Sequence, residues 1–334
     1  MSPAERDRTT RLWLAIAALV FAVLAISLLL GRFPRPYIST PSELAGSSLG
    51  WKIFVSLRLP RVLAAFLLGL SLAAAGTVFQ MIFRNPLVDS GFLGVSQGAA
   101  FGASLAIIFV GGTPWAVQSF AAAFAFLGLG ASYFLARRIR LGDWVLRLVL
   151  AGIAVAALFS AGTGALKYVA DPQRQLPDIT FWLLGGLWGI TWPDVFQILP
   201  LVAACLIVMF LMRWRLNILS MRDETAFSLG VAPGRERLIL LFAATAATAA
   251  VVSKAGQIGW VGLIVPHIAR RVVGSDAKRT LPAAMLLGGV FVLVCDDLAR
   301  TALSGEIPLG ILTSFFGTII FLVLLMKRGL GTRT

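Results

Sequence analysis

The residues that could do chemistry are few, and they lie far apart in the chain. His267 is the single histidine, and the two cysteines, Cys205 and Cys295, both lie inside apolar runs. Transition-metal sites are built from clustered His and Cys ligands, and a disulfide framework needs more cysteines than these two. We therefore predict no catalytic residue and no metal site in this chain, and we expect His267 to be structural.

Three ionisable residues do cluster, in the segment DDLART that begins at Asp296. Asp296, Asp297 and Arg300 lie within one helical turn at the end of an apolar run, where an Asp–Arg pair can neutralise itself. The other apolar runs hold almost no charge, so a proton relay has few candidates beyond the two aspartates. The sequence also contains no Gly-x-x-x-x-Gly-Lys-Ser/Thr phosphate loop and no Gly-x-Ser-x-Gly elbow. The chain thus has no evident energy source of its own.

Two further arginines flank a proline at the start of LRLPRVLAAFLLGLSLAAAG, residues 57–76. Arg58 and Arg61 lie on either side of Pro60, and the small residues that follow favour close helix packing. The arginines could snorkel to a membrane interface. A helix-spaced pair could instead bind carboxylates of a partner protein. The residues alone leave both roles open.

The segment FRNPLVDSGFLGVSQGAAFG, residues 83–102, combines a turn with a glycine-rich helix start. The turn consists of Asn85, Pro86 and Leu87. Asp89 or Ser90 can cap the helix that follows, and its glycines make that helix thin enough for another backbone or a substrate to approach. The alternative is a tightly packed turn without a further role.

A polar, amphipathic segment, LSMRDETAFSLGVAPGRER, occupies residues 219–237. Asp223 and Glu224 are expected to open a short helix that Gly230 ends. Such a helix suits docking to a soluble partner. The alternative is a solvated loop, although the whole charged stretch 213–237 is long for a bare connection.

The elements that position these residues must lie in lipid. The 334 residues are 58% hydrophobic and 13% charged, whereas ordinary soluble domains carry about 25% charged residues. The net charge of +14 would indicate a nucleic-acid partner in a soluble protein, but here the basic residues punctuate apolar stretches. We interpret them as the positive flanks of membrane spans, and we expect no nucleic-acid partner.

Charge-free runs predict an all-α, polytopic membrane protein with ten spans, since a crossing helix needs about 20 apolar residues. The runs are 12–30, 62–83, 90–136, 148–166, 195–212, 238–253, 255–269, 280–295 and 307–326. The run 90–136 is long enough for two spans, and GGTPW at 111–115 divides it. The run 179–193 is short and rich in Gly and Trp, so we predict an interfacial or partly re-entrant segment there.

The distribution of charge sets the orientation. If the N-terminus is cytoplasmic, the cytoplasmic side carries 20 of the 29 lysines and arginines and the other side carries nine. This bias indicates ten spans with both termini in the cytoplasm. The stretch 213–237 then lies in the cytoplasm between spans six and seven of a single membrane domain, 1–334. Ten spans can form two five-span halves, and because five is an odd number a five-span repeat would be inverted in the membrane.

As a set, the motifs resemble those of the FecCD family. LRLPR, FRNPL with GFLGVSQGA, SLGV, GLIVPHIAR and IPLGILTSFFG occur in family order over about 57–317. That family comprises permeases of type II ABC importers for iron–siderophore complexes, haem and cobalamin. The resemblance implies the type II ABC importer permease fold, with two permease subunits around a central path.

The resemblance also implies partners and site residues. Two cytoplasmic ATPase subunits would hold ATP and Mg²⁺, so this chain itself would bind no cofactor, and a periplasmic or lipid-anchored binding protein would deliver the substrate. The family's outer-mouth contacts to that binding protein match Arg58, Arg61 and Arg300. Its cytoplasmic gate matches Asn85, Pro86 and Leu87. Its ATPase-coupling helices match residues 219–233, including Asp223, Glu224, Ser228, Leu229 and Gly230.

We therefore expect a transport subunit rather than an enzyme, in the bacterial cytoplasmic membrane. It would move a metal chelate by alternating access, with iron–siderophore first and haem or cobalamin next, and we expect a homodimer. An ion-coupled secondary transporter is the main alternative, and it would need ionisable pairs within the membrane. A membrane-embedded enzyme would need a cluster of His, Ser or acidic residues at one depth, for which Asp296, Asp297 and Arg300 are a thin basis.

Overall fold

The computed structural model describes residues 3–31, 37–38, 48–140, 142–303 and 305–329. Of the basic residues used in the orientation argument, Arg32, Arg35 and Arg333 lie outside this range. The helices are α1 (Pro3–Leu29), α3 (Ser48–Ile53), the π-helical η1 (Phe54–Arg58), α4 (Leu59–Ile82), α5 (Val95–Phe109), α6 (Pro114–Arg138), α7 (Trp144–Val169), α8 (Gln175–Leu184), α9 (Trp192–Leu211), α10 (Arg213–Leu219), α11 (Asp223–Ser228), α12 (Pro233–Ala255), α13 (Val261–Val273), α14 (Ala277–Thr301) and α15 (Leu309–Gly329). Two short strands, β1 (Leu30–Gly31) and β2 (Tyr37–Ile38), pair antiparallel beside α1.

Each of the ten predicted spans coincides with a helix, which confirms the all-α, polytopic architecture. Eight of these helices are long and apolar enough to cross a membrane on their own. The other two, α5 and α13, have 15 and 13 residues, which at about 1.5 Å per residue is shorter than a hydrocarbon core. The run 179–193 forms the ten-residue α8 and an irregular segment after it, consistent with a segment that does not cross.

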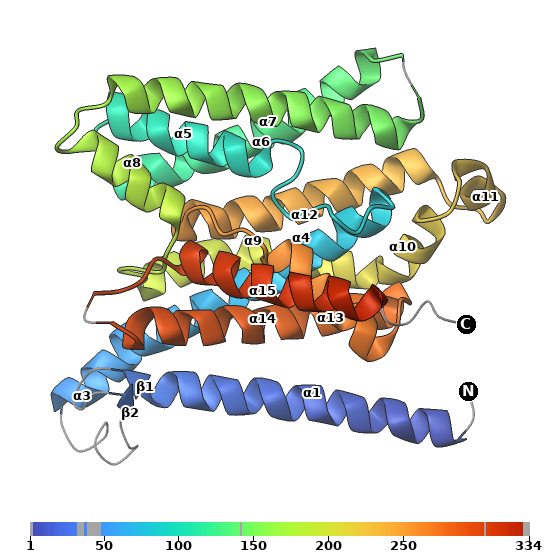
Figure 1. Cartoon of the computed structure of the whole chain (residues 1–334), viewed down its shortest axis with the longest axis horizontal. Coiled ribbons are helices and arrows are strands. Elements are labelled where there is room, and N and C mark those ends of the chain that lie inside the picture. The colour runs from blue at the N-terminus through green and yellow to red at the C-terminus, as the bar shows by residue number, and fades with distance from the viewer. Residues whose placement is uncertain (1–2, 32–36, 39–47, 141, 304, 330–334) are drawn as a thin grey trace.

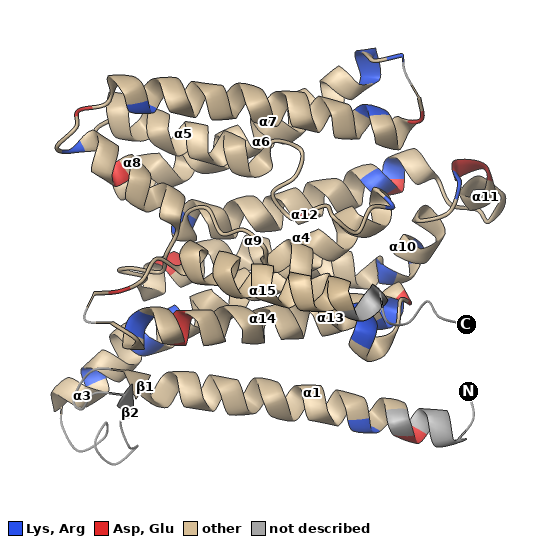
Figure 2. Ribbon diagram, in the orientation of Figure 1, with Lys and Arg blue, Asp and Glu red and all other residues tan. Residues whose placement is uncertain are grey.

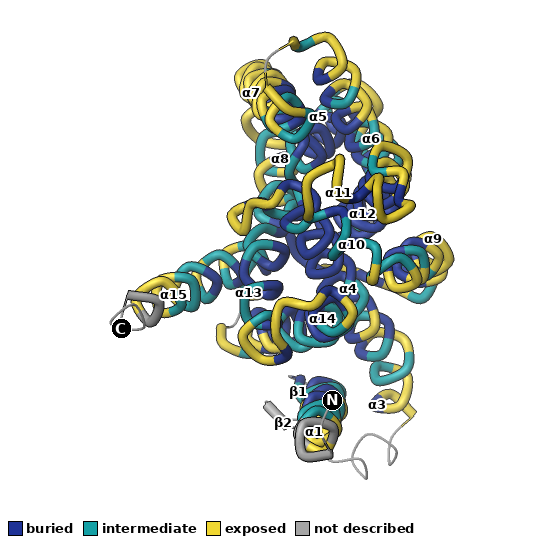
Figure 3. The backbone as a smooth tube through the Cα atoms, turned by 90° about the vertical axis from the view of Figure 1, so that its right-hand side faces the viewer, coloured by how far each residue is buried: buried dark blue, intermediate teal, exposed yellow. Residues whose placement is uncertain are grey.

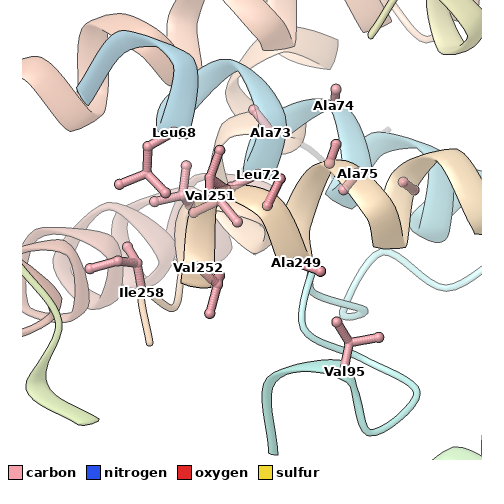
Figure 4. Close-up of a cluster of buried hydrophobic side chains, with 14 of the residues drawn as sticks. Leu68, Leu72, Ala73, Ala74, Ala75, Val95, Ala249, Val251, Val252 and Ile258 are labelled. Atoms are coloured by element: carbon pink, nitrogen blue, oxygen red, sulfur yellow. The ribbon is translucent and has the colours of Figure 1, made fainter. Parts of the chain in front are cut away.

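Helices α4 and α12 form the centre of the molecule, and the other helices surround them (Figures 1 and 3). Both are rich in alanine, and Figure 4 shows Leu68 and Leu72 of α4 close to Val251 of α12. Glycines bring the neighbours closer still: a Cβ added to Gly69 would lie 2.1 Å from the carbonyl oxygen of Gly288 in α14. Small residues thus let backbones touch, and this contact drives helix association where lipid provides no hydrophobic contrast.

The packing repeats between the two halves. Helix α14 of the second half packs along α4 of the first half, and α6 of the first half packs along α12 of the second. Likewise α5 packs on α6, and α13 packs on α14. The first half contains the predicted spans α1, α4, α5, α6 and α7, and the second contains α9, α12, α13, α14 and α15. Because five is an odd number, this correspondence relates the two halves by an inversion in the membrane.

Charged residues collect at the two ends of the bundle, with little charge between them (Figure 2). Both termini, α10 and α11 lie at one end, which we call the basic end. The start of α4 and the end of α14 lie at the opposite end. Helices α1, α7, α9 and α15 on the periphery keep large apolar side chains exposed (Figure 3), as expected of helices that face lipid or another membrane subunit.

Candidate functional site

At the opposite end of the bundle, Arg61 joins α4 to α14 and to the loop before α15. Its guanidinium donates to both carboxylate oxygens of Asp296, with the shortest distance 2.9 Å from Nη2 to Oδ1. Its Nη1 donates to Glu306 Oε1 at 2.8 Å. The side chain of Asp296 is only 1% exposed, whereas that of Glu306 is 35% exposed. Arg61 therefore holds one buried and one accessible carboxylate.

Arg300 and Arg58 tie the same cluster to α1. Arg300 donates to Asp297 and to the carbonyl oxygens of Ser27 and Leu30, the latter at 2.9 Å. Ser27 in turn donates to Asp297 at 2.7 Å. Arg58, the last residue of the π-helical segment, donates to the carbonyl oxygens at the end of α1, 3.1 and 3.2 Å away.

The three predicted outer-mouth arginines thus come together, but Arg58 and Arg300 are buried, Arg61 is only partly exposed, and all three already have hydrogen-bond partners in this chain. Arg58 and Arg300 are less than 10% exposed, and Arg58 points to backbone carbonyls rather than snorkelling to an interface. The Asp–Arg group neutralises itself, as the sequence suggested. Glu306 was not among the predicted residues, because 245 residues separate it from Arg61 and no local pattern joins them.

A cavity of about 750 Å³ lies between the two halves. Its walls come from α7, α8 and α15 and from the irregular segments that precede the short helices α5 and α13. The lining residues are Asp89, Gly91, Phe92, Leu93, Gly94, Ser96, Gln97, Gly152, Ile153, Ala156, Leu183, Leu184, Gln257, Ile258, Gly259, Trp260, Gly310, Ile311 and Ser314.

Unusual backbone geometry forms the two irregular segments. Leu93 and Trp260 have φ angles of 65° and 71°, in the left-handed region that is rare for residues with a Cβ. Each of them lies at the start of a short helix, α5 in the first half and α13 in the second. Short helices in corresponding positions of two repeats commonly flank a transport site. The shortness of the apolar run 255–269 was a sequence signal for this cavity, but the motifs by themselves did not indicate it.

Asp89 bridges these two segments instead of capping α5. Its carboxylate accepts from the backbone N–H of Ser90 at 2.6 Å and from the backbone of Trp260. Gly94 occupies the cap position of α5 with φ 74°, and no side chain caps that helix. The prediction that Asp89 or Ser90 caps the helix was therefore wrong, because the chain needs a left-handed turn between them and α5.

The cavity lining is weakly polar. Glycines and aliphatic side chains predominate, two serines and two glutamines supply polar groups, and Asp89 is the single acid among the lining residues. Among the described residues, no group of three His, Cys, Asp or Glu side chains could hold a metal ion.

At the basic end, the predicted turn follows α4. The Asn85 side chain accepts from the backbone N–H of Leu87 at 2.9 Å, which closes an Asx turn around Pro86. The side-chain amide of Gln80, buried in α4, donates to the carbonyl oxygen of Val88 at 3.1 Å and to those of Gly262 and Leu263. Leu87 itself is 61% exposed. The turn is thus anchored on its inner side and free on its outer side.

The predicted cytoplasmic stretch 213–237, which we call the insert, forms two short helices, α10 and α11, and the start of α12. Asp223 and Glu224 occupy the first turn of α11, and Gly230, with φ 76°, follows its end as expected. Ser228 Oγ donates to the Thr225 carbonyl oxygen at 2.9 Å. Phe227 and Leu229 are 74% and 57% exposed, so the insert presents apolar side chains away from the bundle.

His267 lies within α13, where Nδ1 is 2.9 Å from the carbonyl oxygen of Leu263 and 3.3 Å from Nη2 of Arg270. Arg270 also donates to the buried Gln80 at 2.5 Å. Cys205 and Cys295 are buried and unpaired by disulfides. The histidine thus belongs to a helix-packing network rather than to a reactive site.

Comparison with known proteins places these features in a family. The FecCD transport family matches residues 18–327. An iron chelatin transport system permease protein of Helicobacter pylori is 40% identical over 277 residues, 82% of each chain. The molybdate import system permease protein MolB of Haemophilus influenzae is 36% identical over 280 residues, 83% of this chain and 82% of its own.

A solved structure has the same architecture. An inward-facing metal-chelate type ABC transporter chain superposes with a TM-score of 0.88 and 34% sequence identity, covering 96% of this chain and 99% of its own. The fold, the motif order and the family match agree over nearly the whole length, and this chain belongs to the FecCD transport family.

Proposed function

We propose that this chain is the permease subunit of an ATP-driven importer that moves a metal chelate across the bacterial cytoplasmic membrane. The observation that carries the proposal is the cavity of about 750 Å³ between the two halves, which is weakly polar and lined by both. Family membership supplies the transport class. The cavity itself favours a bulky solute that crosses without chemical change.

In this proposal the basic end lies in the cytoplasm. Figure 2 shows arginines and lysines at that end on several loops and helix ends, as the positive-inside rule requires for cytoplasmic segments. Both termini would then be cytoplasmic. The cluster around Arg61 would face the other side of the membrane, where substrate arrives.

In a homodimer, the insert of each permease subunit would dock one ATPase subunit. Support comes from the exposed Phe227 and Leu229 at a cytoplasmic tip, because apolar side chains exposed together on a surface mark interaction sites. ATP and Mg²⁺ would bind to the ATPases, and their closure would push on the insert. The turn 85–87 would act as the cytoplasmic gate of the path.

The outer arginines would receive acidic side chains of a substrate-binding protein. Because Arg61 already binds two carboxylates of this chain, we propose that docking works by exchange. Glu306 is the accessible partner, so an incoming carboxylate could take its place while Asp296 stays bound. Arg58 and Arg300 would support the mouth from the side of α1.

A second permease subunit would cover the face on which the cavity opens. Its rim includes Ile153 of α7 and Ile311 of α15, and large apolar residues such as Leu158 and Phe315 of the same helices are exposed. Two such faces related by a two-fold axis would enclose one central path. Iron–siderophore is the first cargo that we propose, with haem and cobalamin next, and MolB adds molybdate as a competitor.

An ion-coupled secondary transporter remains the alternative, and one observation favours it. Asp89 is a half-buried carboxylate on the cavity wall, a position where a coupling ion could bind. Its two backbone hydrogen bonds support a structural role instead. We therefore favour the ATP-driven importer.

The proposal is tested by assembly and by stimulated ATP hydrolysis. The chain is co-purified with its ATPase in lipid nanodiscs, and the binding protein is added with ferric siderophore, haem, cobalamin or molybdate. We expect one loaded form to stimulate hydrolysis, and a Phe227→Ala/Leu229→Ala variant to lose the ATPase on purification. Exposed Tyr168→Ala on α7 serves as the control. An ATPase that neither co-purifies nor responds to any loaded binding protein would overturn the proposal.

A further inference from the structure

Two arginines at the basic end share one carboxylate of the insert. Arg237, in the first turns of α12, donates to Asp223 through Nη1 at 3.0 Å and Nη2 at 2.7 Å. Arg84, which directly precedes the turn 85–87, approaches the same carboxylate at 3.5 Å and also donates to the carbonyl oxygen of Met221. Asp223 therefore connects a central helix, the insert and the turn.

The contacts of Asp223 with Arg237 and with Arg84 differ in strength. The side chain of Arg237 is 2% exposed, donates to the Leu219 carbonyl oxygen at 3.1 Å and lies over the Trp144 ring. A bidentate guanidinium–carboxylate pair is among the strongest of charged hydrogen bonds, and here the arginine is buried whereas the side chain of Asp223 is 54% exposed. Arg84 is one-third exposed, and its contact to Asp223 is long. The contact between Arg237 and Asp223 is thus fixed, and the contact between Arg84 and Asp223 is the one that can open.

The backbone at Arg84 directs its side chain to the insert. Its φ of 51° lies in the left-handed region, which a residue with a Cβ adopts only where its surroundings hold it. Backbone hydrogen bonds that end α4, from Arg84 N–H to the Met81 carbonyl oxygen at 3.3 Å and from Asn85 N–H to the Gln80 carbonyl oxygen at 3.1 Å, supply this restraint, and the side chain of Arg84 then reaches Met221 and Asp223. A cavity of about 390 Å³ beside it, lined also by Asp143, Arg222 and Glu224, leaves room for the side chain to move.

We propose that Arg84 is a positioning residue: with Asp223 and Arg237 it forms a clamp through which a displacement of the insert moves the turn 85–87. The inference rests on the proposed function, in which the insert receives the ATPase and the turn gates the path. The inference adds a direct connection between the insert and the turn, made by the single side chain of Arg84. Energy from the ATPase would thus reach the turn without passing through the whole length of α4.

The clamp is tested first on the chain alone, in nanodiscs, by electron paramagnetic resonance. Spin labels are placed at Leu87→Cys and Phe227→Cys, both exposed, while the native cysteines are buried. We expect a narrow distance distribution that broadens in Arg84→Ala and is largely restored in Arg84→Lys. Arg140→Ala is the matched control, because it removes the same charge from the same end and has no ion pair among the described residues.

The second test uses the complete transporter and compares uptake with ATP hydrolysis. Arg84→Ala should keep hydrolysis but lower uptake about tenfold, as expected for the loss of a charged hydrogen bond. In an Asp223→Ala background the same substitution should have a smaller effect, since the contact between Arg84 and Asp223 is already lost and only the hydrogen bond to the Met221 carbonyl oxygen remains to be removed. Melting temperatures check that the variants are folded.

The outcomes separate the two proposals. An unchanged distance distribution in Arg84→Ala, or uptake per ATP equal to wild type, would overturn the clamp. A wild-type complex without ATP-dependent uptake would overturn the proposed function, while the distance measurement still decides whether the clamp exists.

Discussion

Asp296 is the residue whose burial defines the cluster at the opposite end. A carboxylate that is 1% exposed costs several kcal/mol to desolvate, and a buried pair repays this cost only while both partners are present. Arg61 is the partner with the most contacts to it. The cluster should therefore respond strongly to the loss of one arginine.

We expect Arg61→Ala to destabilise the protein by about 3–5 kcal/mol, because it leaves the buried Asp296 with only the longer contact to Arg300, at 3.7 Å. Denaturant unfolding of the detergent-solubilised protein measures the effect. The control is Arg11→Ala, whose pair with Asp7 is 79% and 59% exposed and should contribute less than about 1 kcal/mol. Equal losses for both variants would show that burial does not govern the cluster.

Sequence patterns predicted the residues of this cluster but not their pairing. Arg58, Arg61, Asp296, Asp297 and Arg300 were all visible as charges next to apolar runs. Glu306 and the carbonyl oxygens of α1 were not predicted, because their contacts join residues that lie far apart in the sequence. The same limit applies to Arg84 and Asp223, since periodicity reports local structure and not which helix ends meet.

At the scale of elements, α14 begins with a cap that depends on another helix. Asp276 accepts from the Lys278 backbone N–H at 3.0 Å, and Asn217 of α10 donates to Asp276 at 2.6 Å while accepting from Ala277 N–H. The hydrogen bond from Asn217 holds the pKa of Asp276 below its usual value. The ionised form therefore stabilises the folded state at neutral pH.

This cap predicts a pH-dependent effect of Asp276→Ala. Because the folded pKa is lowered, the stabilisation is complete above the unfolded value of about 3.9 and is lost as pH falls through the folded pKa. We expect a loss of about 1 kcal/mol at pH 7 that shrinks as the pH is lowered below about 4. Melting temperatures of both proteins across this range test it, and a pH-independent difference would contradict the role of the charge.

The contact of α4 with α14 depends on glycine. A Cβ on Gly69 would meet the backbone of Gly288 at 2.1 Å, so we expect Gly69→Ala to force the helices apart and to cost about 1–3 kcal/mol. Gly164→Ala in α7 is the control, since nothing lies within 4 Å of its Cβ position, and it should be neutral or slightly stabilising. Similar losses in thermal unfolding would show that the close approach is unimportant.

Hydrophobic runs in the sequence predicted most of the helices, but they predicted the helices that flank the cavity only in part. The runs 90–136 and 255–269 predicted apolar helices at α5 and α13, whereas Leu93 and Trp260, whose left-handed backbone shortens them, are ordinary apolar residues in the sequence. A left-handed conformation at a leucine or tryptophan is imposed by tertiary packing. It therefore has no sequence signature of its own.

At the scale of the whole molecule, the two inverted halves bring their irregular segments to one cavity and their charges to two ends. The basic end carries the insert and the turn, and the opposite end carries the paired arginines (Figure 2). This separation suits a machine that takes up substrate on one side and receives energy on the other. In the proposed function, this energy comes from ATP.

The most direct measurement is cargo uptake into proteoliposomes that hold the chain with its ATPase and binding protein. Labelled ferric siderophore, haem, cobalamin and molybdate are offered in parallel, with ATP inside or absent and with or without an uncoupler. We predict uptake of one cargo that requires ATP and the binding protein and is unaffected by the uncoupler. Uptake that proceeds without ATP and collapses with the uncoupler would contradict the account and identify an ion-coupled transporter.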